Sequence, residues 1–288
     1  MKTTLSRFPL MWSLVAISIV VVQAGCTTRP NAKQVYPMPP LTLAPSEVPT
    51  QYLALSLGQK PHSTFIKTVI ANQMSQTVQV RYLLYLPDSY GKDPQQKWPL
   101  ILFLHGRGER GDNLDLLEKQ PLPKILEQQA DFPFIVVSPQ LSADKLWWSD
   151  MIDSLNTLLY QIQSTYSVDP MRVYLTGISM GGFGTWEFAL RYPNRFAAIV
   201  PIAGGYQEGS RAIPENICAL CDIPIWVFHG GEDIDVLPFQ SEVLVDALKN
   251  CDGNIRFTFY ADSDHAGSWT RAYADTELYQ WLLAQTLN

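Results

Sequence analysis

The chain has 288 residues, of which 47% are hydrophobic and 17% charged, and this composition is sufficient to bury one sizeable core. It is acidic, with 21 basic residues against 27 acidic ones and a formal net charge of −6. An acidic surface is poorly suited to nucleic acid or to anionic lipid headgroups. The composition therefore favours a globular domain with no nucleic-acid partner.

Residues 1–25 have the organisation of a signal peptide. Lys2 and Arg7 form a basic start, and an almost unbroken apolar run over residues 8–22 follows. This run has signal-peptide length and is shorter than a comfortable membrane span. Small residues then stand directly before Cys26. We therefore predict that the chain is exported and that this segment is not part of the fold.

The residues around Cys26 resemble a bacterial lipobox, in which the cysteine is lipidated and becomes the mature N-terminus. Gln23 stands where a lipobox usually carries an apolar residue, and cleavage after Ala24 or Gly25 by ordinary signal peptidase is the alternative. Thr27, rather than Asp, follows the cysteine, which favours the outer membrane. The resemblance implies an outer-membrane lipoprotein that is anchored through Cys26 and faces the periplasm or the exterior.

Residues 26–60 are rich in Pro, Thr and Ser, which predicts a semi-extended tether between the lipid and the domain. From residue 61 to residue 288, short apolar runs alternate with segments of helical periodicity. Strands that alternate with helices predict an α/β fold with a mostly parallel central sheet and helices on both faces. The predicted strands are 78–86, 100–104, 134–137, 173–175, 197–201, 223–228 and 255–260, and the predicted helices are 151–166, 183–190, 239–249 and 272–285.

The segment 174–182 carries the clearest chemical signal. An apolar strand ends in Gly-Ile-Ser-Met-Gly at 177–181, and a helix-forming segment follows at once. This is the strand–turn–helix context of a nucleophile elbow, in which the flanking glycines avoid collisions with the neighbouring strand and helix. The motif predicts that Ser179 is a nucleophile.

A serine nucleophile needs a base, and on α/β-hydrolase folds the chain order is Ser, then Asp or Glu, then His. The chain has four histidines. Of these, His265 follows Ser179 in a predicted loop between the last strand and the last helix. We therefore predict that His265 is the base.

The acid that orients the base is expected directly after the strand 223–228. Asp233 begins an Asp-x-x-Val turn there, and we predict that it accepts from a ring nitrogen of the base. Glu232 and Asp235 are the alternatives. His229 is expected to support this turn rather than to react.

The oxyanion of the reaction needs two N–H donors. The first is expected to be the N–H of Met180, which follows the nucleophile, and the second to come from an earlier strand–helix loop. Residues 104–111, Leu-His-Gly-Arg-Gly-Glu-Arg-Gly, form that loop, and we predict the N–H of Arg107 as the donor. The side chains of Arg107, Glu109 and Arg110 are expected either to stiffen the loop by pairing or to contact substrate.

Four motifs together resemble the bacterial α/β-hydrolases of the dienelactone-hydrolase and carboxylesterase/phospholipase group, including proteins labelled predicted peptidases, and the feruloyl and polyhydroxybutyrate esterases. The resemblance covers roughly residues 78–288. It implies the α/β-hydrolase fold and a triad of Ser179, Asp233 and His265 that needs no metal and no organic cofactor. The motifs are Leu-His-Gly-x-Gly-Glu-Arg-Gly at 104–111, Gly-Ile-Ser-Met-Gly-Gly at 177–182, Phe-His-Gly-Gly-Glu-Asp at 228–233 and Asp-His at 264–265.

The sequence therefore predicts a serine hydrolase that cleaves small carboxylic esters, above all short-chain or aryl esters, through an acyl-enzyme. A peptidase or amidase of the prolyl-oligopeptidase type that acts on small peptides is one alternative, although the sequence has no region for the propeller domain usual in that class. A non-catalytic, envelope-binding lipoprotein is a second alternative. A binding module, however, has no need of three triad residues in the correct order.

Two further groups of residues have open interpretations. Trp147, Trp148 and Trp269 lie near the expected site, where aromatic side chains either wall a substrate pocket or cap the core. The pair Cys218–Cys221 lacks the further ligands that a zinc site needs, and it precedes a strand, whereas a thioredoxin-like pair follows one. In an exported protein we expect one disulfide among Cys218, Cys221 and Cys251, and the sequence does not fix which pair.

Overall fold

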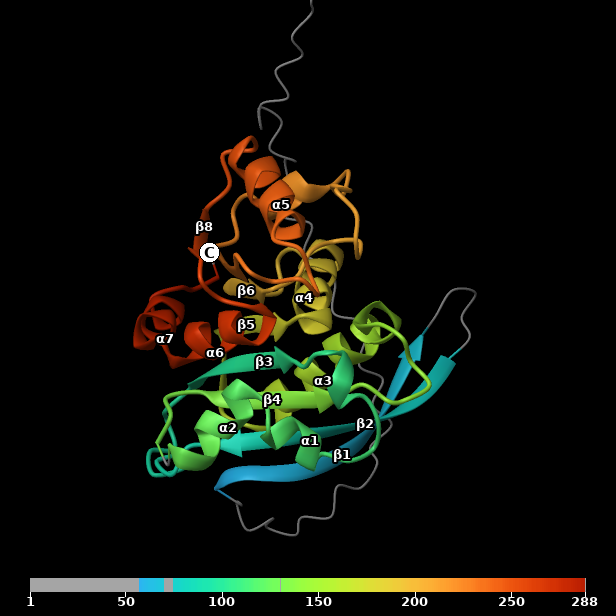
Figure 1. Cartoon of the computed structure of the whole chain (residues 1–288). Coiled ribbons are helices and arrows are strands. Elements are labelled where there is room, and N and C mark those ends of the chain that lie inside the picture. Colours follow the sequence, from blue (N-terminus) through green and yellow to red (C-terminus); the bar gives the residue numbers. More distant parts are fainter. Residues whose placement is uncertain (1–56, 70–74, 130, 288) are drawn as a thin grey trace, which may run out of the picture.

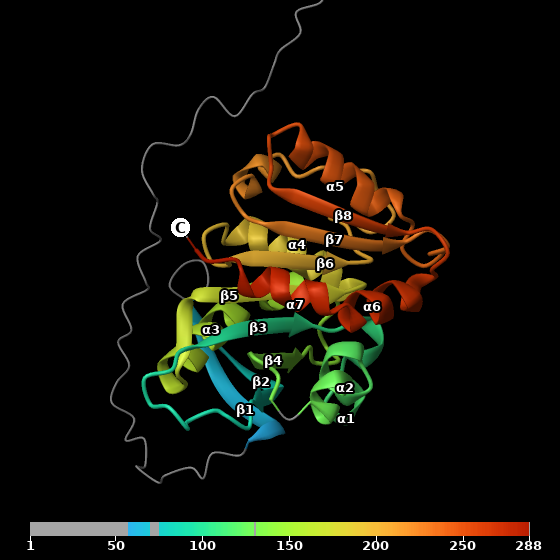
Figure 2. The same cartoon turned by 90° about the vertical axis from the view of Figure 1, so that its left-hand side faces the viewer.

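The computed structural model describes residues 57–69, 75–129 and 131–287, which form one eight-stranded sheet with helices on both faces (Figures 1 and 2). The predicted signal peptide and the predicted lipidation residue Cys26 lie outside these residues. Within the described ranges, no helix combines the length and the apolar character that a bilayer crossing requires.

The sheet has the spatial order β1-β2-β4-β3-β5-β6-β7-β8. The first two strands form an antiparallel pair, and β2 also pairs antiparallel with β4. All other neighbours are parallel, as the alternation of strands and helices predicts. The strands are β1 (Gly58–Val69), β2 (Ser75–Leu86), β3 (Trp98–Leu104), β4 (Ile135–Gln140), β5 (Val168–Ile178), β6 (Ala198–Ile202), β7 (Ile225–Gly230) and β8 (Ile255–Tyr260).

Helices cover the sheet from both sides, and each side has its own core cluster. One cluster contains side chains of α3, α4 and α5, and the other contains side chains of α2, α6 and α7. Figure 2 shows the second group of helices in front of the sheet. The helices are α1 (Asp115–Glu118), α2 (Pro121–Gln128), α3 (Ile152–Thr165), α4 (Met180–Arg191), α5 (Phe239–Lys249), α6 (His265–Ala274) and α7 (Thr276–Leu283).

The strand β3 shows why the central strands read as continuous apolar runs. Leu100 and Leu102 belong to one core cluster, and Ile101 and Phe103 belong to the other. Successive side chains of a strand point to opposite faces, so a sheet covered on both sides needs apolar residues at every position. Burial of each such side chain stabilises the fold by about 1.5–3 kcal/mol.

The structure differs from the sequence-based prediction at the first strand and at the last helix of the domain. The strand β1 begins at Gly58, inside the segment predicted as a tether, and it pairs with β2 over its whole length. The predicted last helix at 272–285 is two helices, α6 and α7, separated at Asp275. Asp275 starts the second helix because its side chain accepts the Glu277 N–H, which caps the new N-terminus.

Candidate active site

Ser179 lies at the turn between β5 and α4, where its backbone has φ 52° and ψ −120°. A non-glycine residue rarely adopts positive φ, and such strained residues cluster at functional sites. A hydrogen bond to the sheet fixes the turn, because the Ser179 N–H donates to the carbonyl of Ile202 in β6 at 3.0 Å. The result is a side chain presented at the carboxyl edge of the parallel strands.

The glycines of the elbow are needed because the backbone segments approach closely. A Cβ at Gly181 would collide with the carbonyl of Leu104 at the end of β3. A Cβ at Gly177 would collide in the same way with the carbonyl of Gly181. The sequence motif therefore reflects the packing of the turn against its neighbouring strand, as predicted from the motif alone.

The structure brings the predicted base and acid to Ser179. His265 Nε2 lies 2.9 Å from Ser179 Oγ, and His265 Nδ1 lies 2.6 Å from Asp233 Oδ2. His265 is not in a loop, as the sequence suggested, but is the first residue of α6. Asp264 causes this earlier start, because its side chain accepts the Gly267 N–H at 2.7 Å and caps the helix.

Asp233 is the buried carboxylate of its turn, whereas the two alternative acids, Glu232 and Asp235, are exposed. Its Oδ1 accepts the N–H groups of Asp235 and Val236 at 3.0 and 2.9 Å. Burial by itself would raise the pKa of Asp233, but hydrogen bonds from two histidines and the Val236 N–H hold the pKa well below its usual range. The carboxylate is therefore ionised at neutral pH.

The predicted oxyanion loop lies against the serine. A Cβ at Gly106 would stand 3.7 Å from the Ser179 Cβ. Arg107 is the first residue of a 3₁₀ turn, η2 (Arg107–Glu109), and Met180 is the first residue of α4. The first N–H groups of a helix have no acceptor within it, so both predicted donors are available to an oxyanion.

His105, which sequence reasoning left without a role, orients this loop. It is fully buried, and its Nε2 accepts the Leu141 N–H at 2.9 Å, so its Nδ1 carries the hydrogen toward the Gly106 carbonyl 2.5 Å away. Burial lowers the pKa of His105 to about 4, which keeps the ring neutral. In a trans peptide the C=O and N–H point in opposite directions, so this bond fixes the direction of the Arg107 N–H.

Comparisons with known proteins find similarity to esterases. Residues 71–210 match the family model described as Putative esterase. A bifunctional acetylxylan esterase/xylanase of Neocallimastix patriciarum is 30% identical over 195 residues, which are 64% of this chain and 26% of that protein. A poly(3-hydroxyalkanoate) depolymerase C of Paucimonas lemoignei is 44% identical over 124 residues, which are 35% of this chain and 30% of that protein.

The structure of a thermostable esterase aligns with a TM-score of 0.62 and 29% identity, over 78% of this chain and 63% of that one. The chain has the α/β-hydrolase fold and is similar to esterases. It spans less than two thirds of the length of each of these three proteins, so the similarity concerns the hydrolase domain and not their whole length.

The side chain of Arg107 lies on the protein surface beside the candidate active site. It forms a two-bonded ion pair with Glu208, at 2.7 and 2.8 Å, and lies over the ring of Trp147 at 5.1 Å. The side chain of Arg110 donates to the Arg107 carbonyl at 3.2 Å, and this hydrogen bond stiffens the loop. The sequence left open whether these side chains pair within the loop or contact substrate, and it did not indicate Glu208, which lies in an irregular segment after β6.

The three candidate tryptophans have different surroundings. Trp148 is 1% exposed and donates its Nε1–H to the His105 carbonyl at 3.0 Å, so it caps the core and supports the oxyanion loop. Trp147 is half-buried against Phe183 of α4, with ring centroids 5.8 Å apart. Trp269 lies edge-on to the ring of His265 at 4.6 Å. Trp147 and Trp269 thus remain candidates for substrate contact.

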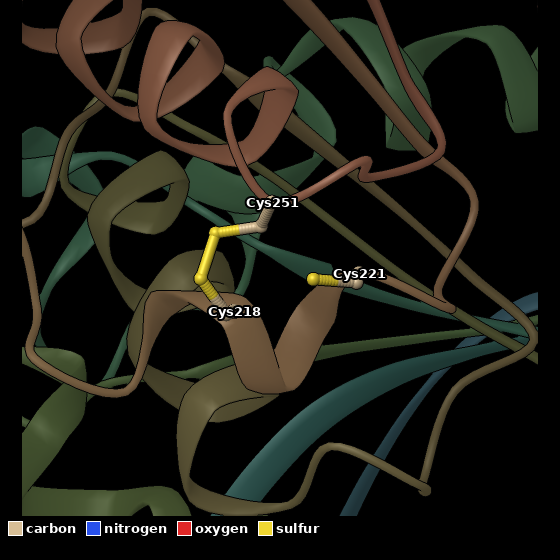
Figure 3. Close-up of side chains that lie close together, drawn as sticks. All are labelled: Cys218, Cys221 and Cys251. Atoms are coloured by element: carbon tan, nitrogen blue, oxygen red, sulfur yellow. A yellow bond between two sulfur atoms is a disulfide. The ribbon is translucent and has the colours of Figure 1, made fainter. Parts of the chain in front are cut away.

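The three cysteines gather between η4 (Ile217–Leu220) and the end of α5 (Figure 3). Cys218 and Cys251 form the disulfide, and Cys221 does not take part in it. The predicted single disulfide is therefore present, in a pairing that the sequence left open. Two sulfurs joined to each other offer no thiolates, so this cluster does not fit a metal ion.

A second group with metal-ligating atoms contains Asp233, Asp235 and His265. Both oxygens of Asp233 already accept hydrogen bonds, and both ring nitrogens of His265 are engaged with Asp233 and Ser179. Metal binding would break the hydrogen-bonded chain that the geometry builds. The residues present therefore fit proton transfer better than coordination.

A cavity of about 450 Å³ lies away from Ser179, between α3, α4 and the segment after β6. Glu187, Asp153 and Tyr206 are among its lining residues. One carboxylate oxygen of Glu187 is buried without a hydrogen-bond partner within the described chain. Burial, together with the nearby Asp150, raises the pKa of Glu187 to about 7. This acid is therefore stabilised in its protonated form.

Glu187→Gln is expected to flatten the pH dependence of stability. Folding raises the pKa of Glu187 from 4.5 to about 7, so the folded state binds the proton more tightly and wild-type stability falls as pH rises through this window. The neutral variant avoids that loss, which amounts to about 2–3 kcal/mol by pH ~8. Urea unfolding of both proteins at several pH values checks this. Parallel stability curves for the two proteins would contradict it.

Proposed function

We propose that the protein is a carboxylic ester hydrolase with Ser179 as its nucleophile. The observation that carries the proposal is the hydrogen-bonded chain from Ser179 Oγ through His265 to Asp233, with distances of 2.9 and 2.6 Å. A serine hydroxyl becomes an effective nucleophile when an oriented base removes its proton. The similarity to an acetylxylan esterase/xylanase and to the structure of a thermostable esterase supports the choice of an ester bond.

The proposed reaction follows from the positions of these groups. His265 removes the proton as Ser179 Oγ attacks the ester carbonyl, and the N–H groups of Met180 and Arg107 stabilise the oxyanion. The intermediate collapses when the imidazolium of His265 protonates the departing alcohol, which leaves an acyl-enzyme. Water, activated by His265, then releases the acid. Asp233 remains ionised and stabilises the imidazolium, which agrees with its lowered pKa.

We propose short-chain or aryl esters as the substrate class. Trp269 stands edge-on to the base, and Trp147 lies beside the oxyanion loop under Arg107. These aromatic faces suit a small acyl or aryl group next to the reacting carbonyl.

The test is hydrolysis of p-nitrophenyl esters, from acetate to decanoate, alongside the p-nitroanilide of acetate, with the Ser179→Ala protein as the blank. Ester turnover that disappears in the variant supports the proposal, and the optimum chain length gives the size of the acyl site. Faster cleavage of the anilide than of the ester would instead support the peptidase alternative. A folded protein without turnover on either series would contradict a hydrolase and favour a binding role.

We further propose that the chain is exported and anchored through Cys26. The basic start, the apolar run of signal-peptide length and the small residues before Cys26 support this proposal. Palmitate labelling in an expressing bacterium is expected for the wild type and not for Cys26→Ser. Equal labelling of the two proteins would refute the anchor.

A further inference from the structure

A second histidine lies behind the proposed catalytic acid. His229 stands near the end of β7, four residues before Asp233, and the side chains of both residues are 0% exposed. Its Nε2 is 2.8 Å from the Val236 carbonyl oxygen and 3.2 Å from Asp233 Oδ2. The ring therefore sits inside the turn that carries the acid and faces the same carboxylate as His265.

The position of one ring hydrogen follows from these contacts. A carbonyl oxygen and an ionised carboxylate can only accept hydrogen bonds. Because both atoms that face Nε2 are acceptors, the Nε2 of His229 must carry a hydrogen. Val236 completes the arrangement, since its carbonyl accepts from His229 while its N–H donates to Asp233 Oδ1 at 2.9 Å.

Both oxygens of the carboxylate have polar partners. Oδ1 receives two backbone N–H groups, and Oδ2 receives His265 at 2.6 Å and His229 at 3.2 Å. An ionised carboxylate offers about four lone-pair sites. The His229 Nε2–H is shared between the Val236 carbonyl at 2.8 Å and Oδ2 at 3.2 Å, so contacts on both oxygens restrict rotation of the carboxylate and hold the oxygen that accepts from His265.

The other edge of the His229 ring is fixed as well. Its Nδ1 lies 2.7 Å from Ser241 Oγ, and the same hydroxyl oxygen lies 2.8 Å from the Gly204 carbonyl oxygen. Gly204 packs against Gly182, in the first turn of the helix that begins after Ser179. The buried ring thus ties the acid turn to the helix of the nucleophile.

We propose that His229 is a positioning residue for the hydrolytic reaction, holding Asp233 Oδ2 where it accepts from His265. This inference rests on the proposed function. His229 touches neither the Ser179 hydroxyl nor a place for substrate, so it acts through Asp233. A purely structural role, in which the ring only closes the turn through the Val236 carbonyl, predicts a loss of stability without a specific loss of kcat.

Two variants at this position separate these roles. His229→Phe keeps the ring volume but has no donor, and is expected to lower kcat on p-nitrophenyl acetate about 10- to 100-fold, the effect of one hydrogen bond to a charged group. KM should change less than about 2-fold, because the site for substrate is intact. His229→Gln, whose amide N–H can donate toward the same acceptors, should recover most of the loss. His62→Gln on β1 is the matched control.

A double-mutant test removes the effect of general destabilisation. In an Asp233→Asn background, His229→Phe should lower kcat less than about 2-fold further, because its route to the reaction is already broken. The same additional loss in both backgrounds would overturn the proposal. So would a folded His229→Phe protein with wild-type kcat, or a glutamine variant no better than phenylalanine.

A proton NMR measurement tests the shared carboxylate without any substrate. The wild type should show low-field ring N–H signals from both His229 and His265, assigned by their loss in the corresponding Gln variants. Asp233→Asn should move both signals, because both donors face one oxygen. Movement of the His265 signal alone would overturn the proposal. Since no turnover is needed, failure of the ester assay would refute the proposed function independently of this result.

A further variant applies if the His229→Phe protein does not fold. Ser241→Ala, which removes the contact at the opposite edge of the His229 ring, should shift the His229 signal and lower kcat.

Discussion

Replacing Ser179 with alanine is expected to lower kcat for an ester about 10⁴- to 10⁶-fold, with KM almost unchanged. The variant lacks the atom that attacks the carbonyl, so the acyl-enzyme cannot form. The proposed oxyanion donors at Arg107 and Met180 belong to the backbone and remain, and they are expected to sustain the small residual rate that water attack gives. Single-turnover and steady-state hydrolysis of p-nitrophenyl acetate measure the loss.

The control for this variant must show that the fold is intact. Alanine tolerates the positive φ of residue 179 no worse than serine does, so thermal unfolding should change little. Ser164→Ala, at an exposed position of α3, is the matched substitution and should retain full activity. If the Ser179→Ala protein keeps more than about 1% of wild-type kcat, Ser179 is not the nucleophile.

The central part of the fold was predictable because its chemistry is local. The apolar run in β3 has residues in both core clusters, so its continuous pattern indicated a strand covered on both sides. The motif around Ser179 was equally readable, because Gly177, Ser179 and Gly181 follow one another at a fixed spacing, although the contact that requires Gly181 is with Leu104 of β3. In each case the residues that carry the signal lie within a few positions of one another.

The features that sequence reasoning missed or left open depend on contacts between segments and not on a local pattern. Glu208 lies in an irregular segment and pairs with Arg107, 101 positions earlier, which no periodicity signals. The disulfide partner of Cys218 lies 33 residues away, whereas the nearer Cys221 forms the familiar spacing. The strand β1 owes its pairing to β2 and begins in a Pro-rich part of the sequence. Sequence reasoning could not place these contacts because their cause is the tertiary fold.

Asp233→Asn is expected to lower kcat about 10⁴-fold while leaving Ser179 and His265 in place. The carboxylate accepts from donors on both sides, so an amide, which has one accepting oxygen, must turn its NH₂ group toward one pair. If the NH₂ faces His265, that ring must present a bare Nδ1 and carry its hydrogen on Nε2, toward Ser179. Such a tautomer cannot remove the serine proton.

The opposite orientation of the amide is no better. An NH₂ group that faces the N–H groups of Asp235 and Val236 places donors against donors and leaves buried groups unpaired. Asp235→Asn is the matched control, because its side chain is exposed, and kcat should stay within about 2-fold of wild type since surface substitutions of this kind cost little. A larger loss in Asp235→Asn than in Asp233→Asn would reassign the acid. The expected result is a large loss of kcat for Asp233→Asn and almost none for Asp235→Asn. It would show that, of the two carboxylates in this turn, only the buried one orients the base.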